Sequence, residues 1–296
     1  MKNTHSLLRN LVLSFRPKTL TAALVPCLAA SALAQSQSKS FVGWILLCAL
    51  FSSVFIQIGT NLVNDAADFK KGADTESRLG PQRITQVGIL NYKTVMLLGA
   101  ASFLLALLLG IPLVIQGGIS IVLIGLISIF MGYAYTAGPF PLAYRGLGDL
   151  FVILFFGIVA VMGMNFLYSG QWSFPAFILG LQIGLLATVL IAVNNLRDIE
   201  GDRLVNKRTL AVRLGKTGAR GEILLLCILP YLIGSYWFVN GPENVFLFPL
   251  LTIPLAGKVI NNILENEPSP FYNKILAQSA ALHLLFGLCL CAGFVL

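Results

Sequence analysis

The chain carries little charge and almost no histidine. Only 11% of its 296 residues are Asp, Glu, Lys or Arg, against about 25% in ordinary soluble domains, whereas 57% are hydrophobic. This composition excludes a disordered chain, a coiled coil and a normal soluble enzyme. The two His residues are isolated from each other, so no His-based metal site is visible. The five Cys residues lack the spacing of zinc-binding or redox motifs, and we expect them to be small buried hydrophobic residues.

Long stretches without any charged residue divide the sequence. A helix needs about 20 apolar residues to cross a bilayer, and lipid requires every backbone polar group to be paired within its own segment. The two longest stretches, 94–144 and 150–196, are too long for one crossing and break naturally at 116–118 and 169–173. We therefore predict an all-α integral membrane protein with nine transmembrane helices. They lie near residues 19–36, 41–64, 94–115, 119–136, 148–168, 174–197, 222–239, 244–264 and 274–296.

The basic residues are distributed unevenly over the predicted loops. With nine crossings, 19 of the 20 Lys and Arg residues fall on the side of the N-terminus, and only Lys39 falls on the other. By the positive-inside rule the basic side is cytoplasmic. The sequence therefore predicts a cytoplasmic N-terminus and an outside C-terminus. The net charge of +8 then reflects membrane topology rather than a nucleic-acid partner.

Eight of the twelve acidic residues lie in two cytoplasmic segments, 65–93 and 197–222, and six of these eight form clusters at 64–74 and 194–202. Within each cluster, acids and amides are spaced three or four residues apart, so they share one face at the cytoplasmic end of a helix. Like charges this close repel one another unless a cation lies between them. Oxygen ligands of this kind suit Mg²⁺, which shares its coordination shell with phosphates and water.

The two clusters repeat one another. Asn64 and Asp68 recur 130 residues later as Asn194 and Asp198. This suggests a single domain over 1–296, built from two halves that are offset by four helices. One mixed-charge cluster alone is usually a solvated loop, but two with matching spacing favour a metal–polyphosphate site. A lipid diphosphate fits such a site, because its tail can lie among the helices while its headgroup stays near the cytosol.

The motifs around these clusters resemble those of the UbiA superfamily of intramembrane prenyltransferases. They are most similar to the 1,4-dihydroxy-2-naphthoate prenyltransferases of menaquinone synthesis, and the resemblance covers nearly the whole chain. Asp74 lies six residues after Asp68, where many relatives use four, and this spacing fits the naphthoate branch rather than the 4-hydroxybenzoate branch. The matching segments are 15–19, 64–74, 80–83, 135–138, 146–149, 194–203 and 207–215.

The resemblance implies both a fold and a reaction. The fold is nine helices around a central cavity, in the cell inner (cytoplasmic) membrane, with the active site facing the cytoplasm. The reaction transfers a polyprenyl group from polyprenyl diphosphate to 1,4-dihydroxy-2-naphthoate with decarboxylation, giving demethylmenaquinone and diphosphate. It proceeds by Mg²⁺-assisted ionisation to an allylic cation, and the implied cofactor is Mg²⁺. The expected partners are these two substrates and the lipid bilayer, with no nucleic acid.

The resemblance also implies roles for particular residues. Asp68 and Asp198 are the main expected Mg²⁺ ligands; Asp65 and Asp202 are expected to complete both the metal shell and the catalytic acidic set, and Asp74 is a further candidate metal ligand. Aromatic rings can stabilise an allylic cation, and Tyr133, Tyr135 and Phe151 lie near the cytosolic ends of their spans. The expected substrate-binding residues are Asn64, Lys71, Arg83, Asn195, Arg197, Lys207, Arg16, Tyr135 and Arg145.

Three other functions compete with this one. A related enzyme would use another acceptor, such as 4-hydroxybenzoate, homogentisate or a chlorophyllide, and acceptor choice depends on the shape of the pocket. A secondary transporter would place ionisable groups near the bilayer midplane, whereas the acids here crowd one membrane face. A purely structural subunit would leave two matched acidic clusters without a role.

Overall fold

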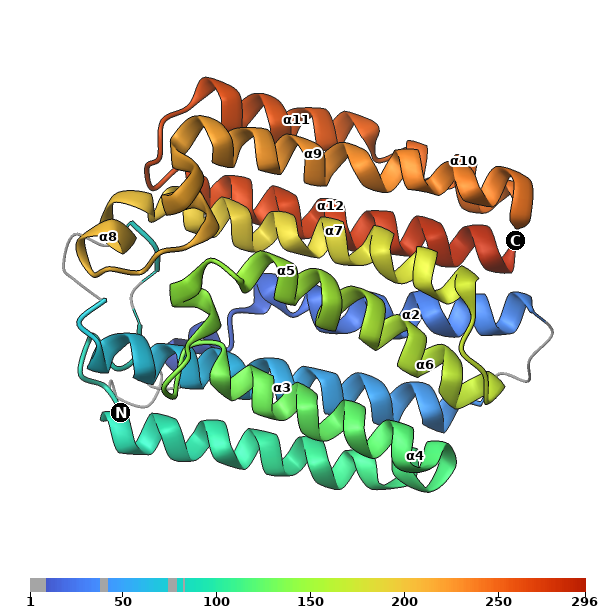
Figure 1. Cartoon of the computed structure of the whole chain (residues 1–296), viewed down its shortest axis with the longest axis horizontal. Coiled ribbons are helices and arrows are strands. Elements are labelled where there is room, and N and C mark those ends of the chain that lie inside the picture. Colours follow the sequence, from blue (N-terminus) through green and yellow to red (C-terminus); the bar gives the residue numbers. More distant parts are fainter. Residues whose placement is uncertain (1–8, 38–41, 74–78, 82) are drawn as a thin grey trace.

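A computed structural model describes residues 9–37, 42–73, 79–81 and 83–296. In these ranges every regular element is a helix, and the long helices lie side by side in one elongated bundle (Figure 1). Six helices are long and apolar enough to cross a membrane, and two bent helix pairs raise the number to as many as eight. The predicted all-helical class is therefore confirmed for the described residues.

Most helix boundaries lie within a few residues of the spans predicted from hydropathy, but the span predicted at 222–239 begins earlier, at Leu210. The elements are η1 (Pro17–Thr19), α2 (Thr21–Ser36), α3 (Gly43–Lys70), α4 (Tyr92–Ala134), η2 (Leu142–Arg145), α5 (Gly148–Val152), η3 (Ile153–Val159), α6 (Ala160–Ser169), α7 (Phe174–Arg197), α8 (Ile199–Leu204), α9 (Leu210–Asn240), α10 (Glu243–Leu250), α11 (Ile253–Glu265) and α12 (Tyr272–Val295).

Helix α3 continues beyond the end predicted from hydropathy. The expected span ended at residue 64, but the helix runs on to Lys70 and includes the first acidic cluster. Every residue from Gly59 to Asp68 is buried. Buried carboxylates are tolerated only when other groups pair with them, and those groups come from segments far away in the sequence. A rule that ends a span at its first charge therefore ends this helix too early.

Helix α4 contains 43 residues and is broken at Gly118, whose φ of 61° and ψ of −150° are not helical. This positive φ strains any residue with a Cβ, but glycine adopts it readily. In Figure 1 the helix runs to one end of the bundle and returns as a second arm beside the first. The predicted break at 116–118 is confirmed. The break predicted at 169–173 is also confirmed, because α6 ends at Ser169 and α7 begins at Phe174.

The predicted span 148–168 is less regular than expected, because its middle part, η3, is a π-helix. Here the backbone of Gly157 lies directly against α7. A Cβ on Gly157 would lie 2.4 Å from the carbonyl oxygen of Gly180 and 2.5 Å from Cα of Gly184. Small residues allow membrane helices to approach this closely. The wider π-turn and these glycines together bring η3 into backbone contact with α7.

The predicted span 244–264 is a bent pair, in which α10 and α11 meet at 43°. Pro249 near the end of α10 and Pro254 at the start of α11 account for the bend, because proline cannot continue the backbone hydrogen bonds. A second bend of 49° separates helical residues Arg9–Thr19 from α2. The largest buried apolar cluster joins α2, α7, α9 and α12, and it reaches α3 through Ile45 and Ala49 and α4 through Leu113 and Ile121.

Candidate functional site

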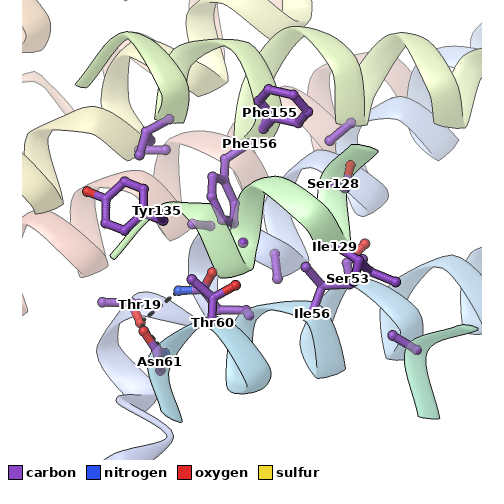
Figure 2. A pocket seen from close by; sticks show the side chains of 18 of the residues that line it. Thr19, Ser53, Ile56, Thr60, Asn61, Ser128, Ile129, Tyr135, Phe155 and Phe156 are labelled. Carbon is purple, nitrogen blue, oxygen red and sulfur yellow. Dashed lines mark hydrogen bonds between the residues drawn. The ribbon is translucent and has the colours of Figure 1, made fainter. Parts of the chain in front are cut away.

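A cavity of about 450 Å³ lies between α2, α3, α4, η3, α6 and α7. Residues of both acidic clusters line its polar part, among them Asn64 of α3 and Asn194 of α7. Figure 2 shows Tyr135 and Phe156 on one wall, facing Thr60 and Asn61 on the other. Farther along the bundle the lining becomes apolar, with residues such as Leu113, Ile121 and Leu167. The cavity thus combines a polar mouth with a long apolar interior.

Asp68 of the first cluster is enclosed by partners at the mouth. Its Oδ2 lies 2.9 Å from Nη1 of Arg83, and its Oδ1 accepts a hydrogen bond of 2.8 Å from the hydroxyl of Tyr144. Burial and the neighbouring Asp68 carboxylate raise the pKa of Tyr144, so the phenol remains a donor at neutral pH. The Asp68 carboxylate is therefore held in one orientation by two groups from outside its own helix.

Asn64 and Asp65 fix the segment that supplies Arg83. The carbonyl oxygen of Asn64 accepts a hydrogen bond of 2.9 Å from Arg83 Nη1. The two carboxylate oxygens of Asp65 accept bonds from the backbone N–H of Ile84 and the hydroxyl of Thr85. Asp65 thus holds the loop in place, and its oxygens are engaged with protein groups rather than with the other acids.

Arg197 organises the second cluster. Its guanidinium donates two bonds to Asp198, from Nε to Oδ1 at 2.8 Å and from Nη2 to Oδ2 at 2.6 Å. Further bonds reach Oδ1 of Asn194 and Oδ1 of Asn273, both at 2.7 Å. Only 1% of Arg197 is exposed. A guanidinium held by so many acceptors is fixed in position, and this suits it to bind an anion at the cavity mouth.

Lysines and a tyrosine connect the two clusters. Lys207 Nζ lies 3.3 Å from Oδ1 of Asp202. Lys71 and Lys207 both lie over the ring of Tyr144, at 4.1 Å and 5.7 Å from its centroid. Burial lowers the pKa of Lys71; Asp68 opposes this effect and Lys207 adds to it. The clusters therefore meet at one end of the bundle, close enough for their charges to interact.

The structure does not bring every predicted residue to the cavity. Arg16, Tyr135 and Phe151 line it. Arg145 is exposed and stacks on Phe140, 3.3 Å from the ring centroid, and Tyr133 is 41% exposed. Asn195 is buried but does not line the cavity. Asp68 and Asp198 are not lining residues either, although they pair with the lining residues Arg83 and Arg197, and the lining also lacks Asp202, Lys71 and Lys207. Asp74 lies outside the described residues.

Several residues of the site were not predicted from the sequence. Asn273, at the start of α12, donates to the carbonyl oxygen of Leu79 and accepts from Arg197. A single Asn at the end of an apolar helix gives no signal from which this role could be predicted. Gln57, Thr60 and Asn61 do give one, because they are polar, lie inside an apolar span and share a helix face with Asn64.

The chemistry of the side-chain ligands determines which metal ion can bind at the cavity mouth. Over the described ranges, no three His, Cys, Asp or Glu residues are grouped closely enough to enclose an ion. Within the two acidic clusters, Oδ2 of Asp202 is a buried carboxylate oxygen that finds no hydrogen-bond partner among the described residues. Mg²⁺ is often bound by one or two carboxylates together with phosphates and water. The residues therefore fit a Mg²⁺ that is shared with a phosphorylated ligand.

Comparison with known protein sequences identifies one family. A profile of the UbiA prenyltransferase family matches residues 23–268. A 1,4-dihydroxy-2-naphthoate octaprenyltransferase of Bacillus subtilis (strain 168) is 31% identical over 286 residues, which cover 95% of this chain and 90% of that protein. Other bacterial relatives with the same name are 27% to 38% identical.

Solved structures with the same fold belong to UbiA homologues. The apo structure of a homologue from Aeropyrum pernix K1 matches with a TM-score of 0.71 at 16% identity, covering 92% of this chain and 97% of that one. A homologue from Archaeoglobus fulgidus bound to DMAPP and Mg²⁺ matches with a TM-score of 0.63 at 14% identity, covering 96% and 99%. At these identities the likeness concerns the fold.

Proposed function

Because this chain belongs to the UbiA prenyltransferase family, we propose that it transfers a polyprenyl group from polyprenyl diphosphate to 1,4-dihydroxy-2-naphthoate. The relatives named as naphthoate octaprenyltransferases support this acceptor and this donor class. One structural observation carries the proposal: residues of two acidic clusters far apart in sequence, Asn64 and Asp65 of one and Asn194 and Arg197 of the other, line the same cavity with an apolar interior. That cavity can hold a charged headgroup and a hydrocarbon tail at once, so the whole chain acts as one catalytic unit.

The same proposal places the protein in the cell inner membrane with nine crossings. The two arms of α4 each count as one crossing, and so does each of the two bent pairs. The end of the bundle that carries α8 and both acidic clusters then faces the cytoplasm, in keeping with the positive-inside rule. The active site is open on that side to the water-soluble naphthoate.

The chemical task is to break the allylic C–O bond of the donor. Negative charge grows on the diphosphate as it leaves, and cations placed beside it stabilise the transition state more than the ground state. Arg83 and Arg197 line the cavity and are fixed by Asp68 and Asp198. We assign the leaving diphosphate to these two guanidinium groups, with Lys71 and Lys207 beside them.

Asp68, Asp198 and Asp202 are the residues that would hold Mg²⁺ with the diphosphate. Oδ2 of Asp202, which finds no hydrogen-bond partner among the described residues, is available to such an ion. When bound, the ion neutralises the developing negative charge on the phosphate oxygens. Burial raises the pKa of Asp202, Lys207 opposes this effect and Asp198 adds to it. A cation at this position would therefore favour the charged carboxylate.

The allylic cation needs surroundings without water and with electron-rich faces. Phe151 lies 5.7 Å from Tyr135 and 4.5 Å from Phe155, measured between ring centroids, and all three rings line the cavity. Aromatic faces attract cations. This wall holds the prenyl cation until a ring carbon of the acceptor bonds to it. The acceptor carboxylate then leaves as CO₂, and the product is demethylmenaquinone in its quinol form.

The product tests the proposal directly. Purified protein in detergent should convert a polyprenyl diphosphate and 1,4-dihydroxy-2-naphthoate into a prenylated naphthoquinol whose mass shows the loss of CO₂. Mass spectrometry of parallel reactions with 4-hydroxybenzoate and homogentisate provides the comparison. We expect much less product from either. A preferred product from one of these acids would refute the naphthoate assignment.

Removal of divalent metal tests the role of the acidic clusters. Excess chelator should lower the rate of prenyl transfer at least about 100-fold, because a metal ion supplies several kcal/mol to such a transition state. Addition of Mg²⁺ beyond the chelator should restore the rate. If the rate is unchanged in excess chelator, the metal assignment is wrong, even where the product assay succeeds.

A further inference from the structure

A stripe of uncharged polar residues crosses the wall of the cavity just inside its mouth. Gln57, Thr60 and Asn61 lie on one face of α3, together with Asn64 at the mouth, and all four line the cavity. At 1.5 Å per residue, Thr60 and Gln57 lie about 6 Å and about 10 Å deeper than Asn64 along the helix axis. Figure 2 shows Thr60 and Asn61 on the wall opposite the aromatic rings.

Hydrogen bonds determine how the Gln57 amide is oriented. The hydroxyl of Thr19 donates to the carbonyl oxygen of Arg16 at 3.0 Å. Its oxygen must then act as the acceptor toward Gln57 Nε2 at 3.2 Å and toward Asn61 Nδ2 at 3.3 Å. Since the nitrogen of Gln57 faces Thr19, the oxygen Oε1 faces the other way. The orientation of this amide therefore follows from its neighbours and is not an arbitrary choice between O and N.

Two acceptors in the stripe lack donors. Gln57 Oε1 and Thr60 Oγ1 are both buried, and neither finds a hydrogen-bond partner within the described part of the chain. Only 7% of each residue is exposed. Buried polar groups are nearly always hydrogen-bonded, and a hydrocarbon tail could offer them nothing. The cavity at this depth is thus suited to a molecule that brings hydroxyl groups.

The depth of the stripe matches the place where the acceptor must react. The diphosphate is held at the level of Arg83 and Arg197, so the first carbon of the prenyl group lies just inside the mouth. An attacking ring carbon must lie about 3–3.5 Å from that carbon. The ring therefore occupies the part of the cavity between the aromatic wall and the polar stripe, with Tyr135 on one side and Thr60 on the other.

We propose that Gln57 Oε1 and Thr60 Oγ1 are the acceptors that recognise the phenolic hydroxyl groups of the aromatic substrate. This inference rests on the proposed function, and it specifies the substrate class as an aromatic acid with hydroxyl donors on its ring. Thr19 and Asn61 are positioning residues, because they act by turning the Gln57 amide. A ring without hydroxyl groups would leave these buried acceptors unpaired, so it should bind with much lower affinity.

Binding measurements with matched ligands test this inference without turnover. Isothermal titration of the full-length protein in detergent gives the Kd for 1-hydroxy-2-naphthoate, 4-hydroxy-2-naphthoate and 2-naphthoate. The wild type should bind at least one hydroxylated acid about tenfold or more tightly than 2-naphthoate, as expected for hydrogen bonds to buried acceptors. Equal affinities for all three acids in the wild type would refute the inference.

Three variants locate the effect. Gln57→Met and Thr60→Val remove the acceptors with little change in volume, and each should reduce the preference for hydroxylated acids to less than threefold while leaving KM for prenyl diphosphate within twofold. Thr60→Val leaves the hydrogen bonds of Gln57 intact, so it still tests the inference if Gln57→Met does not fold. Ser128→Ala changes another lining residue and should keep the wild-type preference. An unchanged preference in both acceptor variants would overturn the inference, whereas failure of the proposed function would appear as a wild type that makes no prenylated naphthoate.

Discussion

Replacing Asp68 by Asn should lower kcat/KM for prenyl transfer at least about 100-fold, a loss typical for removal of one charge-stabilising group from an active site. Asp68 is 3% exposed and pairs with Arg83 and Tyr144. The amide keeps the size of the side chain but loses the negative charge. It can neither balance Arg83 and Lys207 nor attract a divalent ion to the diphosphate. Steady-state kinetics with both substrates varied measures the loss.

The control for this substitution is Glu200→Gln. Glu200 pairs with Arg203 at 3.0 Å and with Lys216 at 3.7 Å, but its side chain is 60% exposed. Exposed ion pairs contribute little free energy, so this variant should retain activity within twofold. Both variants remove one carboxylate from the same end of the bundle, and their difference separates a specific role from general loss of charge. Near-wild-type turnover in Asp68→Asn would contradict the assignment.

Membrane architecture is largely predictable from this sequence, because its signals are local. Runs of apolar residues set the helices, and glycines mark where the chain turns: Gly118 takes a positive φ at the break in α4, and Gly170 does so before α7. Each of these features depends on a few neighbouring residues. The acidic spacing is local in the same sense, since residues four apart share a helix face whatever surrounds them.

The contacts that complete the site are not local, and sequence spacing does not predict them. Arg197 and Asn273 meet although 76 residues separate them, and Arg83 reaches Asp68 from a loop that Asp65 anchors through Ile84. Arg145 was expected at the substrate but stacks on Phe140 instead. Arg145 follows Tyr144 in the sequence, but this adjacency does not determine where the Arg145 side chain points. The polar stripe of α3 was visible in the sequence, but helix periodicity had to be applied to uncharged residues to find it.

Substitution of Gly157 by Val should destabilise the folded protein by about 3 kcal/mol or more, at the upper end of the cost of overpacking. The new Cβ would lie 2.4 Å from Gly180 O and 2.5 Å from Gly184 Cα. These are backbone atoms, so no side-chain rotation can relieve the overlap. We expect a lower melting temperature in detergent and a smaller monodisperse fraction on size exclusion.

The matched control is Gly221→Ala, because a Cβ on Gly221 would lie more than 4 Å from every neighbouring atom in the described part of the chain. This residue lies within α9, where alanine should leave stability unchanged or raise it by up to about 1 kcal/mol. The contrast between the two variants shows whether close backbone approach, rather than glycine content, holds η3 against α7.

Phe151 and Phe155 of the cavity wall lie on α5 and η3. Displacement of η3 should therefore reduce kcat even in the fraction of Gly157→Val that remains folded, and normal kcat in that fraction would show that the wall tolerates the shift.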